Sequence, residues 1–393
     1  MIPRAISPFL HRLASEFRVL VITGPRQSGK TTLAREEFSR HAYVNLEEHD
    51  VRLLAEESPR DFLRENPAPL IIDEVQRAPK LLSYIQTIVD ATKTNGQYIL
   101  TGSHQPRLKA DVSQSLAGRA AYVTLLPLSI AELTAAGIDM DRDDYLFKGF
   151  MPRLYDEKVT PEYFYKNYYS TYVERDARQL VNLGNQRAFE IFFKLLAGRI
   201  GQLVNFNGMA GEVGVSAPTL AAWMSILEAS HIVFRLQPYY QNFGKRVQKT
   251  PKVYFTEPGL AAHLLGIQSA EQVFQNPLFG GLFENMVIVE ALKARLNTGQ
   301  SDNGGLYFLR DQHGLEVDMI VEQSGRKLQP VEIKGGRTYD PSFAKNLRAY
   351  QAIAGASCVS PAVIYAGEQE ATRQGVRFAN FKNTARITSK AAC

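Results

Sequence analysis

Cysteine and tryptophan are scarce in this sequence of 393 residues, which has two cysteines and one tryptophan. The two cysteines, Cys358 and Cys393, show no metal-ligand spacing. Small secreted domains without a large core depend on several disulfide bonds, so this composition excludes a disulfide scaffold and fits a reducing compartment.

Long hydrophobic runs are absent as well. The longest apolar run among residues 1–24 is VLVI, whereas a signal peptide needs a longer apolar stretch and a membrane span needs about 20 apolar residues. We therefore expect a cytoplasmic protein without a membrane partner, although an amphipathic segment lying on a membrane surface stays open.

The charge imbalance is small. Lysine and arginine total 45 and aspartate and glutamate total 40, which gives a net charge of +5 and a pI of about 9.0. This balance permits a nucleic-acid partner but does not require one. A chain of this length is expected to fold as two or three domains.

A short β-branched run precedes a glycine-rich loop in residues 19–31, VLVITGPRQSGKT, and a helical pattern follows. This is the pattern G-x-x-x-x-G-K-[ST] in its strand–loop–helix setting. Gly24 and Gly29 let the backbone curl so that N–H groups point at phosphate oxygens, Lys30 can reach the β- and γ-phosphates, and the Thr31 hydroxyl can bind Mg²⁺. The predicted nucleotide-binding residues of this loop are Gly24, Pro25, Arg26, Gln27, Ser28, Gly29, Lys30, Thr31 and Thr32.

An apolar run that ends in two carboxylates, PLIIDEVQ, occupies residues 69–76. Such a strand end is common by itself, but downstream of a P-loop it predicts the acidic half of a nucleotide site. We expect Asp73 to hold the Mg²⁺ ion and Glu74 to polarise the attacking water as the catalytic base.

The rest of this region alternates between strand and helix patterns, as an α/β domain does. The strand candidates are residues 43–46, 70–73, 97–100 and 122–125.

Other polar residues stand close to these strands. Ser103, or Thr101, could sense the γ-phosphate at the end of the third strand, or serve only the turn. Arg119 precedes the fourth strand and could act as a catalytic arginine finger, in its own chain or on a neighbouring subunit, or be a surface arginine. Ser129 and Glu132 have capping-box spacing and are interpreted as structural.

Five motifs in order, GPRQSGKT, LIIDEVQ, ILTGS, SLAGRAAYVTLLPLSIAEL and GFMPRLYDE, resemble those of a prokaryotic group of AAA+-type P-loop ATPases. Members of that group continue into a C-terminal domain of unknown function with a restriction-endonuclease-like core. The resemblance spans most of residues 18–157 and implies ATP rather than GTP, and no N-K-x-D motif for guanine is present.

We therefore expect an α/β protein of three units. These are a P-loop NTPase (AAA+-like) domain at 1–140, a helical and winged-helix-like domain at 141–250, and an α/β restriction-endonuclease-like domain at 251–393.

The middle region has the order helix, short helix, turn, helix and strand within residues 187–236, which is typical of a helix-turn-helix that leads into a wing. Ser216 is a good N-cap and Pro218 suits the first turn. The second helix, APTLAAWMSILEAS, has no Arg, Lys, Asn or Gln, so base-specific contacts are not expected from it. Protein packing and contacts to the DNA backbone both stay open.

A basic segment, FGKRVQKTPK, occupies residues 243–252 at the expected wing. Its four cationic residues could contact phosphates, or form a solvated turn. They are Lys245, Arg246, Lys249 and Lys252.

The last third contains a nuclease-type set of residues in order. Glu284 lies on the apolar face of a predicted helix, Asp318 lies on the return strand of a hairpin, and PVEIKGG contains Glu332 and Lys334 on one strand face. We expect Glu284, Asp318 and Glu332 to bind Mg²⁺, with Glu332 and Lys334 as catalytic residues. Glu316 is a further possible ligand, because it shares a strand face with Asp318.

These patterns predict an ATP-binding protein and Mg²⁺-dependent ATPase that couples ATP to a nuclease-like, DNA-acting module. Two alternatives stay open: a Mg²⁺ nuclease gated by ATP, and an ATP-gated switch that binds a protein partner through an inactive nuclease-like domain. The partner, nucleic acid or protein, and an oligomeric state are left open as well.

Overall fold

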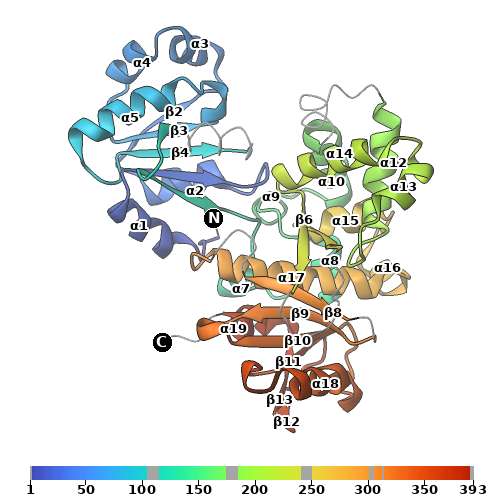
Figure 1. Ribbon diagram of the computed structural model, residues 1–393. Helices are drawn as coiled ribbons and strands as arrows, with labels where there is room; N and C mark the ends of the chain where they lie inside the picture. The colour runs from blue at the N-terminus through green and yellow to red at the C-terminus, as the bar shows by residue number, and fades with distance from the viewer. Residues whose placement is uncertain are drawn as a thin grey trace.

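The computed structural model describes residues 2–103, 115–173, 185–239, 250–300, 305–311 and 314–389. The strands in these ranges form two sheets, one with five strands and one with eight. In Figure 1 the first sheet lies in the upper part of the molecule in blue, cyan and green, and the second runs from the middle to the bottom in yellow, orange and red.

The first sheet is entirely parallel, with the order β2-β3-β4-β1-β5. The segments predicted as strands in the N-terminal region all lie in this sheet, which confirms the α/β class of that region. Strand β4 lies between β1 and β3, so the P-loop strand and the acidic strand are not direct neighbours. The strands are β1 (Val19–Thr23), β2 (Ala42–Asn45), β3 (Leu70–Asp73), β4 (Tyr98–Gly102) and β5 (Ala120–Thr124).

Helices cover both faces of this sheet, because successive side chains of a strand point to opposite faces. Val19 and Val21 pack into the core on one face, and Leu20 and Ile22 pack into the core on the other. The flanking helices are α1 (Ser7–Glu16), α2 (Lys30–Glu37), α3 (His49–Glu57), α4 (Pro59–Glu65) and α5 (Leu81–Thr92).

Short helices connect the first sheet to the middle of the chain. They are α7 (Ile130–Ala135), α8 (Arg142–Lys148), α9 (Arg153–Asp156) and α10 (Pro161–Tyr168). The predicted capping box starts α7: Ser129 accepts a hydrogen bond from the Glu132 N–H, and the Glu132 carboxylate accepts one from the Ser129 N–H.

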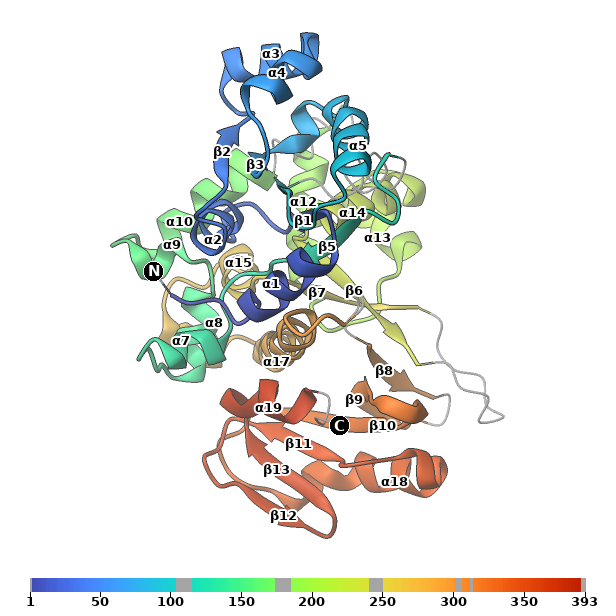
Figure 2. The ribbon, with the colours of Figure 1, turned by 90° about the vertical axis from the view of Figure 1, so that its left-hand side faces the viewer.

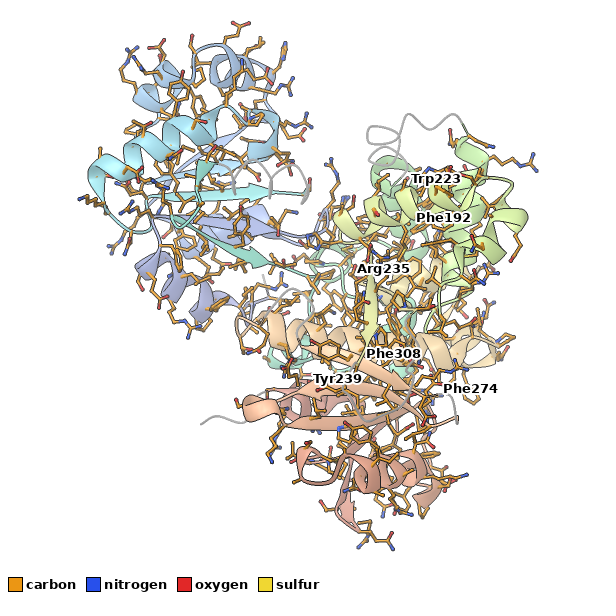
Figure 3. The ribbon with its side chains drawn as sticks, in the orientation of Figure 1. Phe192, Trp223, Arg235, Tyr239, Phe274 and Phe308 are labelled. Carbon is orange, nitrogen blue, oxygen red and sulfur yellow. The ribbon has the colours of Figure 1, made fainter. Side chains whose placement is uncertain are left out.

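Three helices and a strand follow in the predicted order. They are α12 (Gln186–Ala197), α13 (Phe206–Val213), α14 (Ala217–Ala229) and β6 (Val233–Pro238). The Ser216 side chain caps α14 by accepting a hydrogen bond from the Thr219 N–H over 3.3 Å, as predicted. Phe192 of α12 and Trp223 of α14 pack with ring centroids 5.8 Å apart in the core of this helical part (Figure 3).

The second sheet has the order β12-β13-β11-β10-β9-β8-β6-β7. Strands β6 and β7 form an antiparallel hairpin that crosses the predicted boundary at residue 250, and β6 also pairs with β8. The middle and last regions therefore share one sheet, and the domain boundaries stay predictions. The remaining strands are β7 (Lys252–Phe255), β8 (Leu306–Arg310), β9 (Glu316–Glu322), β10 (Leu328–Lys334), β11 (Ala362–Tyr365), β12 (Ala371–Arg373) and β13 (Val376–Asn380).

Helix α17 (Phe279–Leu296) packs against α8 and against β7 and β10 of the second sheet, and Figures 1 and 2 show it above the orange and red strands. Its apolar side chains join the largest core of the molecule, together with those of α8, α12, α14 and β7. No helix in the described ranges is long and apolar enough to cross a membrane. The other helices are α15 (Pro258–Leu264), α16 (Ala270–Gln275), α18 (Lys345–Ala354) and α19 (Thr384–Thr388).

Candidate nucleotide site and C-terminal acidic cluster

The P-loop connects β1 to α2, as the sequence predicts. Gly24 has φ +151°, and a Cβ atom there would lie 2.1 Å from the Leu125 carbonyl oxygen, so no other residue fits without a shift of the backbone. Gly29 precedes α2 with φ +90°, a left-handed conformation that glycine adopts at no steric cost. These two glycines give the loop the curl that a phosphate-binding loop needs.

Two polar side chains of the loop are buried. Lys30 donates hydrogen bonds from Nζ to the carbonyl oxygens of Gly24 (3.1 Å) and Pro25 (2.8 Å). The Ser28 hydroxyl has no hydrogen-bond partner among the described residues. The loop therefore holds an ammonium group and an unpartnered hydroxyl close to its own backbone.

The parallel sheet brings Thr31 and Asp73 together at its carboxyl edge. The Thr31 hydroxyl donates to Asp73 Oδ2 over 2.7 Å, and the Tyr43 hydroxyl donates to the same oxygen over 3.0 Å. Thr101 donates to Asp73 Oδ1, which also accepts the Glu74 N–H. Asp73 is thus held in one orientation by side chains from three other elements.

Glu74 follows the strand in a left-handed conformation with φ +55°. Its carboxylate accepts hydrogen bonds from Gln76 and, over 3.2 Å, from the Ser103 hydroxyl. Ser103 was predicted to sense the γ-phosphate; in this structure its hydroxyl contacts the predicted catalytic base.

A cavity of about 500 Å³ adjoins the P-loop. It is lined by Arg26, Gln27, Gly29, Lys30, Thr31, Thr32 and Glu74, and by Pro152, Arg153, Asp156 and Glu157 on the other side. Arg153, which the sequence analysis did not select, forms a half-exposed ion pair with Glu157 over 2.8 Å. Its signal was present, since it lies in the motif GFMPRLYDE.

Arg119 lies at the amino-terminal end of the parallel strands, whereas the P-loop lies at their carboxyl-terminal end. It directly precedes β5, whose first residue pairs with Val19 at the start of β1, whereas the P-loop follows the end of β1. At about 3.3 Å per residue, the two ends of β1 are about 13 Å apart. Arg119 forms a two-point ion pair with Asp90 (2.5 and 2.7 Å), so a finger role within its own chain is not supported by this geometry.

A second group of charged side chains, the C-terminal acidic cluster, lies where α17 meets the second sheet. Its members are Lys252, Glu284, Glu316, Asp318, Glu332 and Lys334. Lys252 of β7 is buried, and its Nζ lies 3.2 Å from Glu284 and 2.8 Å from Glu316. Glu284 also accepts a 2.5 Å hydrogen bond from the Tyr254 hydroxyl. Burial, followed by the Asp318 charge, raises the pKa of Glu284 to about 7. The wing strand β7 therefore supplies a lysine and a tyrosine to this group.

The E-x-K pair lies in the same neighbourhood. Lys334 Nζ is 2.7 Å from Glu332 and 3.4 Å from Asp318, which also accepts the Ile333 N–H over 2.8 Å. Burial, followed by the Asp318 charge, raises the pKa of Glu332 to about 8. Glu332 and Lys334 share one strand face, as predicted.

Within the described ranges, however, no three His, Cys, Asp or Glu side chains lie close enough together to hold a metal ion. The predicted ligands Glu284, Asp318 and Glu332 do not converge on one point, and Lys252 and Lys334 pair with them instead. Wing residues Lys245, Arg246 and Lys249 lie outside the described residues.

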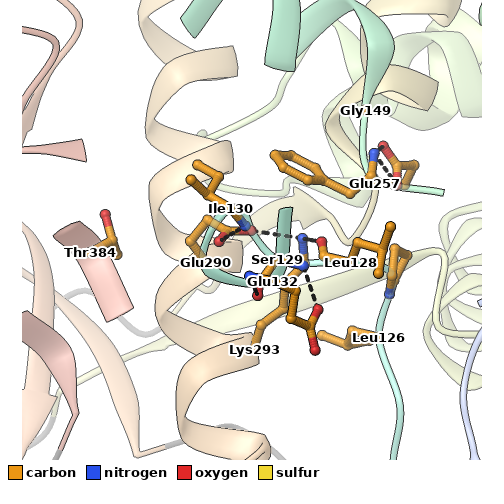
Figure 4. A network of polar contacts seen from close by, with 12 residues as sticks. Leu126, Leu128, Ser129, Ile130, Glu132, Gly149, Glu257, Glu290, Lys293 and Thr384 are labelled. Atoms are coloured by element: carbon orange, nitrogen blue, oxygen red, sulfur yellow. Dashed lines mark hydrogen bonds and ion pairs between the residues drawn. The ribbon is translucent and has the colours of Figure 1, made fainter. Parts of the chain in front are cut away.

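A buried polar network connects the segment after β5 to α17 (Figure 4). Glu290 accepts the Ile130 N–H over 2.7 Å, and Lys293 donates to the Leu128 carbonyl over 2.6 Å and to Glu290 over 2.8 Å. Glu257 of the turn before α15, to which the sequence analysis gave no role, accepts the Phe150 N–H over 2.9 Å.

Residues 16–134 match the family model of an AAA domain. Residues 140–271 and 279–383 match two models described as domains of unknown function, DUF8612 and DUF4143. The N-terminal region is thus an AAA-type P-loop domain, followed by regions whose families have no assigned function.

The chain is similar to two proteins whose names describe them only as uncharacterized. One from Mycobacterium tuberculosis strain H37Rv is 29% identical over 362 residues, which are 91% of this chain and 79% of the relative. One from Methanocaldococcus jannaschii is 23% identical over 329 residues, covering 68% of this chain and 66% of the relative. Among solved structures, the Walker-type ATPase PABY2304 of Pyrococcus abyssi is 15% identical with a TM-score of 0.43, over 67% of this chain and 96% of that one.

Proposed function

We propose that this protein is a Mg²⁺-dependent ATPase in which ATP binding and hydrolysis are coupled to the C-terminal part of the chain. The observation that carries the proposal is the 2.7 Å hydrogen bond from the Thr31 hydroxyl to Asp73 Oδ2. A hydroxyl and a carboxylate in contact beside a phosphate-binding loop are the pair of hard oxygen ligands that Mg²⁺ takes at P-loop sites.

The residues present fit ATP and Mg²⁺. The Ser28 hydroxyl is buried without a partner among the described residues, and the adjoining cavity of about 500 Å³ lies in the size range of small-molecule sites. Thr31 and Asp73 would hold the ion, which would neutralise charge on the phosphate oxygens when bound.

The side chains of the site then take separate roles. Lys30 binds the β- and γ-phosphates as a point charge. Glu74 accepts a proton from the attacking water, and the Ser103 hydroxyl orients the Glu74 carboxylate. Arg153 brings a second cation to the cavity from α9, where it stabilises negative charge on the phosphates.

Coupling to the C-terminal part is supported by buried contacts that begin near the nucleotide site. The segment after β5 is tied to α17 through Leu128, Ile130, Glu290 and Lys293. The same helix contributes Glu284 to the acidic cluster. A movement of this segment during the ATP cycle would therefore act on the helix that holds the cluster.

ATP binding by the purified full chain tests the proposal, measured by calorimetry with Mg²⁺ on the wild type and on Lys30→Ala. We expect the wild type to bind ATP and the variant to bind at least about tenfold more weakly, because Lys30 supplies the charge on the β- and γ-phosphates. A folded wild type that takes up no ATP contradicts the proposal.

A metal-dependent nuclease in the last third is the second candidate function. The observation that favours it is Glu332 Oε1, a buried carboxylate oxygen without a hydrogen-bond partner among the described residues, next to Lys334 and Asp318. This second candidate predicts DNA cleavage by the wild type with Mg²⁺ and the loss of that cleavage in Asp318→Asn. No cleavage with or without ATP favours the ATP-gated switch with a protein partner.

A further inference from the structure

Arg4 lies in the segment before α1, outside every motif of the nucleotide site, yet its guanidinium group contacts the P-loop. The side chain is 7% exposed. Its Nη1 donates to the Ser28 carbonyl oxygen over 2.9 Å, its Nη2 donates to the Leu126 carbonyl oxygen over 2.6 Å, and its Nε donates to Glu132 over 3.1 Å. One buried cation thus joins the P-loop, the segment after β5 and the start of α7.

The contact with Ser28 fixes the orientation of one peptide unit. A trans peptide is planar, and its C=O and N–H point in opposite directions. Because the Ser28 carbonyl faces Arg4, the Gly29 N–H faces away from Arg4. The first N–H groups at a helix start have no partner within the helix, and those of a P-loop helix are the ones that bind phosphate oxygens.

Gly29 lies directly against the Arg4 guanidinium group. A Cβ atom at Gly29 would lie 3.6 Å from Arg4 Nη1, and the φ of +90° is one that residues with a side chain rarely adopt. Arg4 therefore packs directly behind the peptide that opens α2.

Glu132 holds Arg4 in place. Its Oε1 accepts the Arg4 Nε–H and the Ala5 N–H over 2.7 Å, while its Oε2 accepts the Ser129 N–H. Figure 4 shows Glu132 in contact with Ser129 at the start of α7. The carboxylate is buried and fully used, so the guanidinium group is fixed before any ligand arrives.

We propose that Arg4 is a positioning residue of the nucleotide site: it holds the Ser28–Gly29 peptide so that the Gly29 N–H is directed to the ATP phosphates. The inference rests on the proposed function. It adds a residue about twenty positions before the P-loop to the residues that determine affinity for ATP. Lysine cannot replace it fully, because an ammonium group cannot reach three separated acceptors in the planar arrangement of a guanidinium group.

The test compares Arg4→Met, Arg4→Lys and the control Arg18→Met in the full chain. Arg18 is another partly buried arginine that bonds Asp90 over 3.0 Å, and it directly precedes β1 at the edge away from the P-loop. For each variant we measure the Kd for a fluorescent ATP analogue with Mg²⁺, KM and kcat for ATP, and the Tm without nucleotide.

We expect Arg4→Met to raise Kd and KM about tenfold or more and to change kcat less than about threefold, because a lost phosphate-facing amide weakens binding rather than the chemical step. Arg4→Lys is expected to recover part of the affinity, and Arg18→Met to keep the wild-type Kd. If Arg4→Met does not fold, Arg4→Lys still decides, since we expect its Kd to rise about threefold.

Wild-type Kd values in the folded Arg4 variants overturn the inference. A lower Tm with unchanged Kd in the Arg4 variants, together with the same decrease of Tm in Arg18→Met, overturns it as well. This result differs from failure of the proposed function, in which the wild type itself binds no ATP.

Discussion

Lys252 of β7 and Glu284 of α17 form a buried ion pair with Nζ 3.2 Å from Oε1. Lys252 also pairs with Glu316 over 2.8 Å, so one ammonium group contacts two carboxylates. Burial lowers the pKa of Lys252, but the charges of Glu284 and Glu316 raise it by more. The pKa of Lys252 therefore lies above its ordinary value. The lysine takes a place in this cluster that the sequence analysis gave to a metal ion.

Replacement of Lys252 by a neutral residue tests whether the acidic cluster needs a cation for stability. We expect Lys252→Met to lower stability by about 3–5 kcal/mol, because Glu284 is left buried without a cation beside it. Added Mg²⁺ should then raise the Tm of the variant more than that of the wild type. Thermal unfolding with and without Mg²⁺ measures both effects. The double variant Lys252→Met/Glu284→Gln is the control, and an equal Mg²⁺ response in all three proteins contradicts the prediction.

Ser103 and Glu74 form the second testable pair. We expect Glu74→Gln to bind ATP with near wild-type affinity and to hydrolyse it at least about a hundredfold more slowly, since it cannot act as a base. Ser103→Ala should slow hydrolysis about tenfold by releasing one hydrogen bond to the base. Steady-state turnover and ATP affinity, measured together, separate these effects. A Ser103→Ala variant with weaker ATP binding and unchanged kcat would instead indicate a direct contact with phosphate.

The position of Arg119 makes a different prediction. Because it lies at the sheet edge away from the P-loop and pairs with Asp90, we expect Arg119→Ala to leave the turnover of dilute, monomeric protein within about twofold of wild type. Turnover measured over a range of protein concentrations checks this. A loss that appears only where subunits associate indicates a finger supplied to a neighbouring subunit, and a loss at every concentration contradicts the prediction.

Glu332 should make stability depend on pH. Its folded pKa of about 8 lies above its ordinary value, so the folded chain holds a proton that the unfolded chain releases. The stabilisation is therefore complete below about pH 4.5 and is lost as the pH rises through about 8, by an amount on the order of a few kcal/mol. Glu332→Gln should flatten this dependence between pH 5 and 9. Urea unfolding midpoints across this range test it, and parallel curves for the two proteins contradict it.

Much of the first sheet could be predicted because each local pattern determines its structure. The VLVI run must lie in a strand buried on both faces, and G-x-x-x-x-G-K-T must curl before a helix. The pairing of Thr31 with Asp73 followed from these patterns. The strand order could not be predicted from these patterns, because the sequence of an apolar strand does not determine which strands lie beside it.

Contacts across long distances in the chain were beyond the sequence. Arg4, Glu257 and Lys293 each bind a backbone group more than a hundred residues away in the sequence. Nothing in the local sequence around these residues identifies that partner. The E-x-K pair was predicted because two residues of one strand share a face. The sequence analysis placed Lys252 in a basic wing because it ends the run FGKRVQKTPK. Its burial could not be predicted there, because the partners Glu284 and Glu316 come later in the chain.

Gly335, directly after the E-x-K pair, gives the last prediction. Arg142 at the start of α8 donates a hydrogen bond to its carbonyl oxygen, and the guanidinium group stacks on the Phe279 ring at 4.6 Å. A Cβ atom at Gly335 would lie 2.5 Å from that same ring, whereas one at Gly336 would lie 3.6 Å from Phe343 in ordinary contact.

We therefore expect Gly335→Ala to destabilise the protein by about 1–3 kcal/mol, as overpacking does, and Gly336→Ala to stay within about 0.5 kcal/mol of the wild type. The inserted methyl group must displace Phe279 and with it Arg142, so the loop that follows Lys334 loses its contact with α8. Thermal unfolding gives the stability, and hydrogen exchange of residues 333–337 reports the loop. Faster exchange in Gly335→Ala but not in Gly336→Ala is the expected pattern, and equal exchange in both variants would show that α8 does not hold the end of β10.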